Sequence, residues 1–361
     1  MISKSFYESL EDIANERGLD IAKVLEKVEV AMQIACKNSD CPYKGEVKLE
    51  SDYETKKIRF FNYTRVVEEV DPEGPRGQIT LEEAKVDHPK AKIGQEYREE
   101  IKLATFKHKA AAMFKQTLNN ELKNLEREEA YNYFSGCVGE VVVGKIANTN
   151  DKYVTLSLKN SVTATISVRD CLPNETFTLG DELRVYVVGV ERTNKGPKIM
   201  LCRNNREIVK KLFEMYIPEI KNGSVEIMNI ARDAGSRSKV GVMAVNPNVD
   251  AKGSCVGVGG TRIKNVNDAL NGEKMDVFEW SSDPVQLISN ALTPANILSV
   301  MANPEEKSAM VVVTDDQFSL AIGKGGQNTR LAAIATGWHI DLHKLSEAVE
   351  EKINFIPNVS K

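Results

Sequence analysis

Two stretches in the N-terminal third carry apolar residues at helical spacing. In the first, an apolar face follows Asp20, a residue suited to cap a helix. The second lies between Gly94 and Gly136, where no glycine or proline interrupts an apolar repeat of four residues. If about 30 of these residues are helical, the helix is on the order of 45 Å long, which is typical of a connector between domains. The apolar positions are Ile21, Val24, Leu25, Val28, Met32 and Ala35, then Phe106, Ala110, Phe114, Leu118 and Leu122.

Other parts of the chain have the texture of β-strands. Residues 57–61 and 63–67 alternate as strands do. After Gly136, short strands follow one another at regular spacing, separated by turn residues. Five strands in about 70 residues are typical of a small closed barrel of the OB type, although a barrel without any ligand has the same strand count. The predicted barrel strands are 139–143, 153–158, 162–168, 183–190 and 198–201.

The remainder of the chain contains an internal repeat. Residues 255–260, CVGVGG, align with residues 321–326, AIGKGG, which lie 66 positions further on. Each motif has a strand-like segment before it and another after it. Each copy therefore reads strand, helix, glycine turn, helix, strand, and the repeat predicts two α/β modules after the barrel. The flanking segments that match are 240–245 with 310–313 and 272–277 with 337–342.

The second copy shows the helix signals more clearly. Thr314 and Gln317 predict a capping box at the start of a short helix that runs to Ile322. The glycine turn 323–326 then leads into a second helix, which is expected to end at Gly337 as a left-handed cap. The side chains of the second helix that are predicted to face inward are Leu331, Ile334 and Ala335.

Such glycine turns can hold an anion. Glycines that flank two free positions let a ligand approach the bare backbone, and amides at a helix start favour negative charge. Lys324 adds a full positive charge at the tip of the second turn. Neither turn matches G-x-G-x-x-G or the G-K-[ST] phosphate loop. The alternative interpretation is two helical hairpins closed by flexible turns, but the repeat in the same helix–turn–helix context favours the binding interpretation.

Composition and charge limit the function classes. The chain has 361 residues, 42% hydrophobic and 28% charged, which is typical of a globular protein of two to four domains. No apolar stretch reaches the roughly 18 residues of a membrane span, and the N-terminus meets acidic residues too early for a secretory signal. The net charge of −4 excludes binding to nucleic acid through bulk positive charge. Residues 203–345 hold 16 basic and 16 acidic residues, so any RNA contact must be local.

Signals for metal binding and catalysis are weak. The six cysteines form no C-x-x-C pair, so we expect reduced thiols rather than a zinc ribbon or a disulfide framework. His339, Asp341 and His343 fall on one face of a predicted strand; this spacing suits a metal, but it is more typical of the solvated side of an amphipathic strand. No catalytic triad signature is present. We therefore expect no metal, no cofactor and no enzymatic activity.

Three segments give the chain a family resemblance. Residues 231–239, ARDAGSRSK, are close to the family segment ARDPGSR-x-K, with Ala234 in place of proline. Residues 247–260 resemble the family's D-P-V-G-A-C-V-G-x-x-G, and residues 328–332 resemble its N-V-R-L-A. Together with the order of the predicted domains, they make nearly the whole chain resemble the NusA family of bacterial transcription termination/antitermination factors.

The resemblance implies a fold class. The expected architecture is multidomain α+β, with a helical/β N-terminal domain and connector helix, an S1-type OB barrel, and two tandem KH domains of the prokaryotic type (type II). The chain ends soon after the second KH segment, so we expect the acidic C-terminal repeats of some relatives to be missing. The expected domain ranges are 1–132, 133–202, 203–282 and 283–347, followed by a tail at 348–361.

The resemblance also implies a function. Proteins of this family bind RNA polymerase core through the N-terminal domain near the RNA exit channel and hold single-stranded nascent RNA with the S1–KH–KH array. They promote pausing and intrinsic termination, and with other Nus factors they support antitermination, notably in ribosomal RNA operons. We accordingly expect a monomeric cytoplasmic protein with RNA polymerase, RNA and other Nus factors as partners and without membrane contact.

The candidate RNA-binding residues lie mainly in the two modules. In the first glycine turn Val258 and Gly259 supply no cation, so Arg262 and Lys264 are the expected substitutes. For each single basic residue, a solvated surface charge remains the alternative. The candidates are Gly257, Val258, Gly259, Gly260, Arg262 and Lys264, then Gly323, Lys324, Gly325, Gly326 and Arg330, and also Arg232, Arg237 and Lys239.

The predicted barrel has few aromatic residues for base stacking. Tyr153, Phe177 and Tyr186 are the only rings between Gly136 and Cys202. Because stacking contributes about 1–3 kcal/mol per base, we expect the barrel alone to bind RNA weakly.

Two other function classes remain open from the sequence. One is an RNA-binding S1/KH protein of ribosome assembly or RNA decay that does not contact polymerase. Exoribonucleases of the polynucleotide phosphorylase type carry these parts in the opposite order, after large catalytic domains for which this chain has no room. The other class is a nucleotide-dependent enzyme that uses the glycine turns, and it predicts saturable binding of ATP or NAD.

Overall fold

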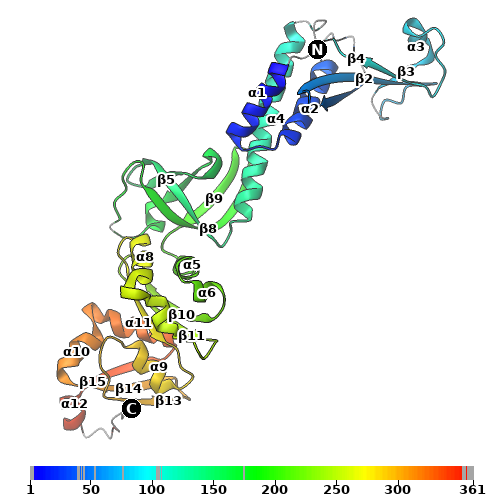
Figure 1. Cartoon of the computed structure of the whole chain (residues 1–361). Coiled ribbons are helices and arrows are strands. Elements are labelled where there is room, and N and C mark those ends of the chain that lie inside the picture. The colour runs from blue at the N-terminus through cyan, green and yellow to red at the C-terminus, as the bar shows by residue number, and fades with distance from the viewer. Residues whose placement is uncertain are drawn as a thin grey trace. The chain divides into compact units, whose positions relative to one another are not determined.

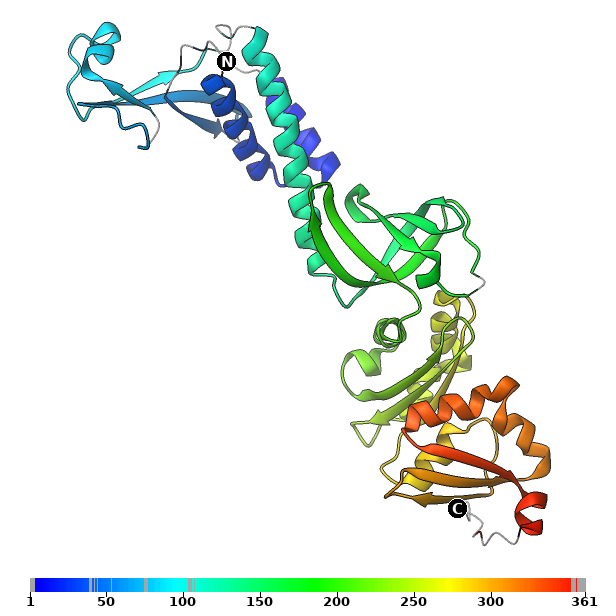
Figure 2. The ribbon, with the colours of Figure 1, turned by 180° about the vertical axis from the view of Figure 1, so that it is seen from behind.

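The chain divides into two compact units. The computed structural model describes residues 4–351 and 355, apart from 39–40, 42, 44, 53, 75–76, 103–105, 107 and 174. Most of the expected tail at 348–361 therefore lies outside the described residues. Figures 1 and 2 show the ribbon from two sides. The N-terminal unit comprises Met1–Tyr133 and Arg192–Pro197, and the C-terminal unit comprises Phe134–Glu191 and Lys198–Lys361.

Helices α1, α2 and α4 build the core of the N-terminal unit with one face of a sheet. Asp20 accepts a hydrogen bond from the amide of Ala22 at 2.9 Å, which caps α2 as predicted. The apolar face behind it is buried against Leu10 of α1, Phe60 of the sheet and Leu122 of α4. In both views α1 and α2 lie beside α4 (Figures 1 and 2). The helices are α1 (Lys4–Arg17), α2 (Ile21–Asn38) and α4 (His108–Ser135).

The long predicted helix is confirmed. Helix α4 contains 28 residues and is therefore about 42 Å long at 1.5 Å per residue. On the side of α1 and α2 it is held by ion pairs as well as by apolar packing. Arg17 contacts Glu126 at 2.5 Å and Lys23 contacts Glu129 at 2.6 Å.

The sheet of the N-terminal unit is organised around one long strand. The sequence pattern predicts separate strands at 57–61 and 63–67, but β2 is continuous, because the side chain of Asn62 is buried and accepts the amide of Gly45 at 2.8 Å. Strand β2 pairs antiparallel with β1 and β4 and parallel with β3. Helix α3 follows β3 and has a complete capping box at Thr80. The elements are β1 (Glu46–Asp52), β2 (Lys57–Val67), β3 (Gln78–Thr80), α3 (Leu81–Asp87) and β4 (Glu96–Glu100).

A barrel-like sheet opens the C-terminal unit. Within the described residues it has five strands in the order β7-β6-β5-β8-β9, which curl around a core that includes Leu156, Val185 and Phe134. The five predicted strands are confirmed, although the first begins later and runs to Thr149. The elements are β5 (Val141–Thr149), β6 (Tyr153–Ser157), η2 (Lys159–Ser161), β7 (Thr163–Ser167), η3 (Val168–Asp170), β8 (Glu182–Thr193) and β9 (Gly196–Cys202).

The first module follows the barrel. Strands β10 and β11 pair antiparallel, and β12 pairs parallel with β11. The parallel pairing is possible because α7 and α8 cross from one strand to the other over the module. Its elements are α5 (Glu207–Tyr216), α6 (Pro218–Lys221), β10 (Val225–Asp233), β11 (Arg237–Ala244), α7 (Ala251–Val256), η4 (Val258–Gly260), α8 (Thr261–Ala269) and β12 (Lys274–Glu279).

The second module repeats this topology, as predicted. Strands β13 and β14 are antiparallel, and β15 is parallel to β14. Helices α10 and α11, joined by the glycine turn, connect β14 to β15. Its elements are α9 (Pro284–Ala291), β13 (Ser299–Asn303), β14 (Ser308–Val313), α10 (Asp315–Ile322), η5 (Lys324–Gly326), α11 (Gln327–Thr336), β15 (His339–Lys344) and α12 (Leu345–Glu350).

A buried arginine joins the barrel to the first module. The guanidinium of Arg203 donates to both carboxylate oxygens of Glu175, to the carbonyl of Arg184 and to the carbonyl of Ala269 in the first module. The side chains of Arg203 and Glu175 are almost completely buried. Because the guanidinium reaches groups on both sides, it fixes how the barrel sits on the first module.

Two local predictions in the second module are wrong. Thr314 caps α10, but its side chain makes no capping hydrogen bond. The backbone amide of Gln317 donates to the carbonyl of Thr314 at 2.9 Å, and the side-chain amide of Gln317 donates to Asp316 at 3.0 Å. Ile334 was expected to face inward with Leu331 and Ala335, yet it is 52% exposed whereas the other two are buried. The left-handed cap at Gly337 is confirmed.

Candidate nucleic-acid interface

The two glycine turns have the same backbone. Gly257 has φ 72° and ψ 173°, and its counterpart Gly323 has φ 73° and ψ 174°. The third and fourth positions of each turn also have positive φ, a region that other residues rarely adopt. The repeat in sequence is therefore a repeat in conformation. The other positive-φ positions are Gly259, Gly260, Gly325 and Gly326.

Each turn is closed on one side and open on the other. A Cβ on Gly323 would lie 2.9 Å from the amide nitrogen of Asn328, and one on Gly257 would lie 2.7 Å from Cγ of Arg262. At Gly325, by contrast, a Cβ would meet no atom within 4 Å, and the same holds for Gly259, Gly260 and Gly326. The first glycine of each turn is thus required by packing, whereas the last two expose their backbone to any molecule that approaches.

Lys324 lies at the tip of the second turn. It is exposed, and no carboxylate among the described residues pairs with it. Behind it, the buried side chain of Asn328 holds the turn by donating to the carbonyls of Ala321 at 2.9 Å and Leu292 at 3.1 Å. The structure therefore presents an available cation on a fixed turn at the start of α11.

The first turn differs in charge. Val258 stands at the place of Lys324 and is 92% exposed. Arg262 is half-buried, and its guanidinium donates to Glu219 and to the carbonyl of Ser254, both at 2.8 Å. Lys264 is exposed, and no described carboxylate pairs with it. Of the two expected substitute cations, only Lys264 is therefore uncommitted.

Two of the predicted RNA contacts are in the interior, which corrects their expected role. The side chain of Arg232 is 3% exposed and forms a bidentate pair with Glu273, whose carboxylate also accepts from Ser238 and the amide of Gly235. Lys239 is 1% exposed and donates to the carbonyl of Thr293 at 2.9 Å. Both cations are predicted contacts of the RNA face, but Arg232 holds the first module together and Lys239 bonds to Thr293 in the second.

Burial also changes the ionisation of Lys239. Desolvation lowers its pKa to about 8, although Asp276, whose carboxylate lies 3.4 Å from Nζ, acts in the opposite direction. Asp276 also pairs with Arg237, at 2.8 Å. Arg237 is partly exposed, so it stays a candidate for RNA contact with a carboxylate already beside it.

The two modules meet through contacts that the sequence did not indicate. Asp233, at the end of β10, accepts from Gln327 at 2.6 Å and from Arg330 at 2.8 Å, both on α11. Asn229 donates to the carbonyl of Ala335 at 2.8 Å. Because α11 begins directly after the second glycine turn and packs on β10, these bonds fix that turn relative to the first module. Asp233 lies within the ARDAGSRSK segment, which was the only signal in the sequence.

The barrel offers little aromatic surface. Tyr153 is half exposed, whereas Phe177 packs against the barrel core and Tyr186 against the core of the first module. The barrel therefore exposes fewer rings for base stacking than its sequence contains.

The structure also places the histidines and cysteines that the sequence analysis considered as metal ligands. In β15, His339 and Asp341 are exposed, and His343 lies 3.0 Å from Asp341. Across the described residues, no group of three or more His, Cys, Asp or Glu gathers as metal ligands do. All six cysteines are free thiols. In the described part of the chain, no helix combines the length and apolarity that crossing a membrane requires.

Family models cover the N-terminal part and both modules. Residues 5–128 match the NusA N-terminal domain, residues 203–280 match the NusA-like first KH domain, and residues 284–350 match the NusA-like second KH domain. The last two matches coincide with the first and second modules. With the five-stranded barrel sheet between them, they confirm the fold class expected from the sequence.

Curated relatives match over nearly the whole chain. The transcription termination/antitermination protein NusA of Bacillus subtilis is 37% identical over 97% of this chain and 93% of its own length. The protein of the same name from Halalkalibacterium halodurans is 36% identical over 97% and 90%, and that from Thermus thermophilus is 35% identical over 94% and 89%. The chain therefore belongs to the NusA family.

Proposed function

We propose that this chain is a non-enzymatic transcription factor that binds RNA polymerase and the nascent transcript. The observation that carries the RNA part is the pair of glycine turns with one backbone conformation, the second of which bears an uncommitted Lys324. The family assignment supports the transcription part, since the relatives are named termination/antitermination proteins.

Single-stranded RNA is held by its backbone in this proposal. The amide of Gly325, at the open tip of the turn before α11, favours a phosphate, and Lys324 adds a full charge. The amide of Gly326 instead holds the turn by donating to the carbonyl of Gly323 at 3.2 Å. The contact is local, which agrees with equal numbers of basic and acidic residues in 203–345. Lys264 and Arg330 extend the same surface, while the first turn contributes through its backbone.

We assign the remaining roles by domain. Residues 1–132 bind the polymerase core near the RNA exit channel, residues 133–202 form an S1 barrel that binds RNA weakly, and residues 203–282 and 283–347 are the KH pair. The protein promotes pausing and intrinsic termination and takes part in antitermination with other Nus factors. It acts as a monomer in the cytoplasm.

Charge reversal at the second turn tests RNA binding. Lys324→Asp and Gly325→Asp each place a carboxylate where the phosphate is held, so we expect a large loss of affinity for single-stranded RNA in a filter assay. Lys307→Asp is a matched control, because Lys307 is exposed in the same module and its φ of 47° suits aspartate. Unchanged circular dichroism must accompany the loss, and unchanged binding in both turn variants would refute the role of the turn.

A pull-down tests polymerase binding. Immobilised residues 1–130 and the whole chain should both retain core RNA polymerase from a bacterial lysate, whereas residues 134–361 should not. If neither the fragment nor the whole chain retains polymerase while RNA binding persists, the protein is a general RNA-binding protein, as in ribosome assembly or RNA decay.

Calorimetry tests the enzyme alternative. Titration of the whole chain with ATP or NAD should release no saturable heat, because the turns bind the backbone of a strand and neither matches a nucleotide loop. Saturable binding that Gly325→Asp removes would favour a nucleotide-dependent activity instead.

A further inference from the structure

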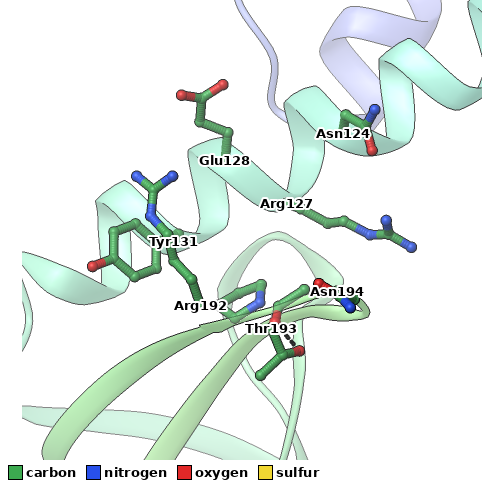
Figure 3. Close-up of a pocket in the computed structure, with 9 residues that line it drawn as sticks. Asn124, Arg127, Glu128, Tyr131, Arg192, Thr193 and Asn194 are labelled. Carbon is green, nitrogen blue, oxygen red and sulfur yellow. Dashed lines mark hydrogen bonds between the residues drawn. The ribbon is translucent and has the colours of Figure 1, made fainter.

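A polar pocket lies in the N-terminal unit. It forms where the turn between β8 and β9 packs against α4, and it has a volume of about 300 Å³. Figure 3 shows Arg127 and Tyr131 on α4 and Arg192 and Asn194 on the turn, with the guanidinium groups of the two arginines pointing to opposite sides. Neither the sequence patterns nor the family models pointed to this pocket.

The turn that forms one wall is held in place. The hydroxyl of Thr193 donates to the carbonyl of Gly196 at 2.7 Å and accepts the amide of Lys195 at 3.2 Å. Gly196 has a φ of 126°, and a Cβ there would lie 3.4 Å from Cγ of Arg127. A glycine thus lets the turn approach α4 closely, so the pocket has a preformed shape.

The pocket carries two guanidinium groups. Arg192 lies over the ring of Tyr131, with 4.1 Å between the guanidinium carbon and the ring centroid. No carboxylate among the described residues pairs with Arg192 or with Arg127. Glu128 is the single acidic residue of the lining, so the lining has a net positive charge, and Asn124 and Asn194 add amide donors and acceptors.

We propose that this pocket binds one nucleotide unit of single-stranded RNA. Arg127 holds a phosphodiester, a base stacks on the flat surface made by Arg192 and Tyr131, and Asn124 and Asn194 bond the base or ribose. The volume is small enough for one unit, and the mixture of guanidinium, ring and amide groups fits a nucleotide better than a protein surface. The inference rests on the proposed RNA binding and adds a site outside the KH pair.

The affinity and salt dependence of the whole chain test the site. For an unstructured fluorescent RNA, Arg127→Gln with Arg192→Gln should lower affinity about tenfold, the equivalent of one charge-assisted hydrogen bond. The slope of log K against log salt should fall by about 0.7, because one phosphate contact is lost. The matched control is Lys109→Gln with Lys115→Gln, which removes two exposed charges from the same helix outside the pocket.

Two more variants separate charge from stacking. Arg127→Lys with Arg192→Lys should restore the salt slope but not the whole affinity, because lysine keeps the charge and loses the planar surface. Ultraviolet cross-linking should attach RNA to a peptide containing Tyr131 in the wild type, and the double glutamine variant should lose this adduct.

The outcomes distinguish the site from the proposed function. Suppose that Lys324→Asp loses RNA affinity, but that Arg127→Gln with Arg192→Gln binds RNA as well as the Lys109→Gln, Lys115→Gln control. The RNA function then stands and this site is refuted. If the wild-type chain binds no RNA, both fail. If AMP binds in a calorimetric titration while the double glutamine variant keeps full RNA affinity, the pocket takes a free nucleotide and the proposal is overturned.

Discussion

The carboxylate of Asp233 and the guanidinium of Arg330 lie 2.8 Å apart and join the two modules. Asp233 ends a strand of the first module, and Arg330 lies one turn into the helix that follows the second glycine turn. Both side chains are about half exposed, so the pair contributes little to stability. Its position matters more, because a negative charge stands beside a cation of the proposed RNA surface.

Asp233→Asn should strengthen RNA binding. The amide still accepts from Gln327, while Arg330 becomes available to a phosphate. Because an exposed ion pair is worth up to about 1 kcal/mol, we expect affinity to rise by about two- to fivefold at low salt. Fluorescence anisotropy at several salt concentrations measures this RNA affinity. Arg330→Gln should reverse the gain in the double variant, and a gain that persists there would contradict this explanation.

Val258→Lys should give the first turn the charge that the second already has. The two turns share one backbone conformation, and Val258 is almost fully exposed, so the new lysine meets no steric obstacle. We expect tighter RNA binding and a salt slope steeper by about 0.7, as one added phosphate contact requires. Val258→Gln is the uncharged control, and an equal gain in that variant would rule out an electrostatic cause.

Gly323→Ala and Gly325→Ala should separate packing from ligand access. At Gly323 the φ/ψ pair belongs almost only to glycine and a Cβ would meet Asn328, so a loss of about 1–3 kcal/mol from strain alone is expected. At Gly325 the Cβ enters open space. The only loss of stability is that of placing alanine in the left-handed conformation, roughly 1–2 kcal/mol. Thermal unfolding measures which variant loses more stability. A larger loss in Gly325→Ala than in Gly323→Ala would contradict the described turn geometry.

Arg203→Leu should destabilise the C-terminal unit strongly. It leaves the buried carboxylate of Glu175 without its partner, and breaking such a pair typically costs about 3–5 kcal/mol. Urea unfolding followed by the far-ultraviolet signal measures the loss. The double variant with Glu175→Leu should recover part of it, because no uncompensated charge then remains. A fully additive double variant would argue against the pair.

Lys239→Met should alter how stability depends on pH. The folded pKa of Lys239 is about 8, below the unfolded value of about 10.4, so between these values the unfolded chain binds a proton that the folded chain has released. The wild type therefore gains stability as pH rises through this range. From pH 7 to 9 we expect the gain, relative to the variant, to be about 1 kcal/mol in urea titrations. Parallel curves for the two proteins would show that Lys239 ionises normally.

Local patterns were enough to predict the elements and the turns. Asp20 caps α2 because its side chain reaches an amide two residues away, and the turn at 323–326 follows from glycines that alone adopt its conformation. The internal repeat predicted a helix before and after each glycine turn, because each helix of a module must bury one apolar face. In all these cases the causes lie within a few residues of each other.

Side-chain partners far apart in the sequence were not predictable. Arg232 and Glu273 are 41 positions apart, and their pairing buries a cation that the sequence predicts as an RNA contact. Ile334 looked like a core residue by spacing, yet α11 leaves it exposed. The pocket between α4 and the β8–β9 turn joins residues more than 60 positions apart, so no local pattern could indicate it.

The amino-acid order by itself determined the elements, the duplication of the α/β module and the conformation of the glycine turns, because backbone preference and apolar period act over short distances. Only the tertiary structure decided which cations remain available, since availability depends on whether folding brings a distant carboxylate or carbonyl to each one. Lys324 stays available and Lys239 does not, although the sequence predicts both lysines as RNA contacts.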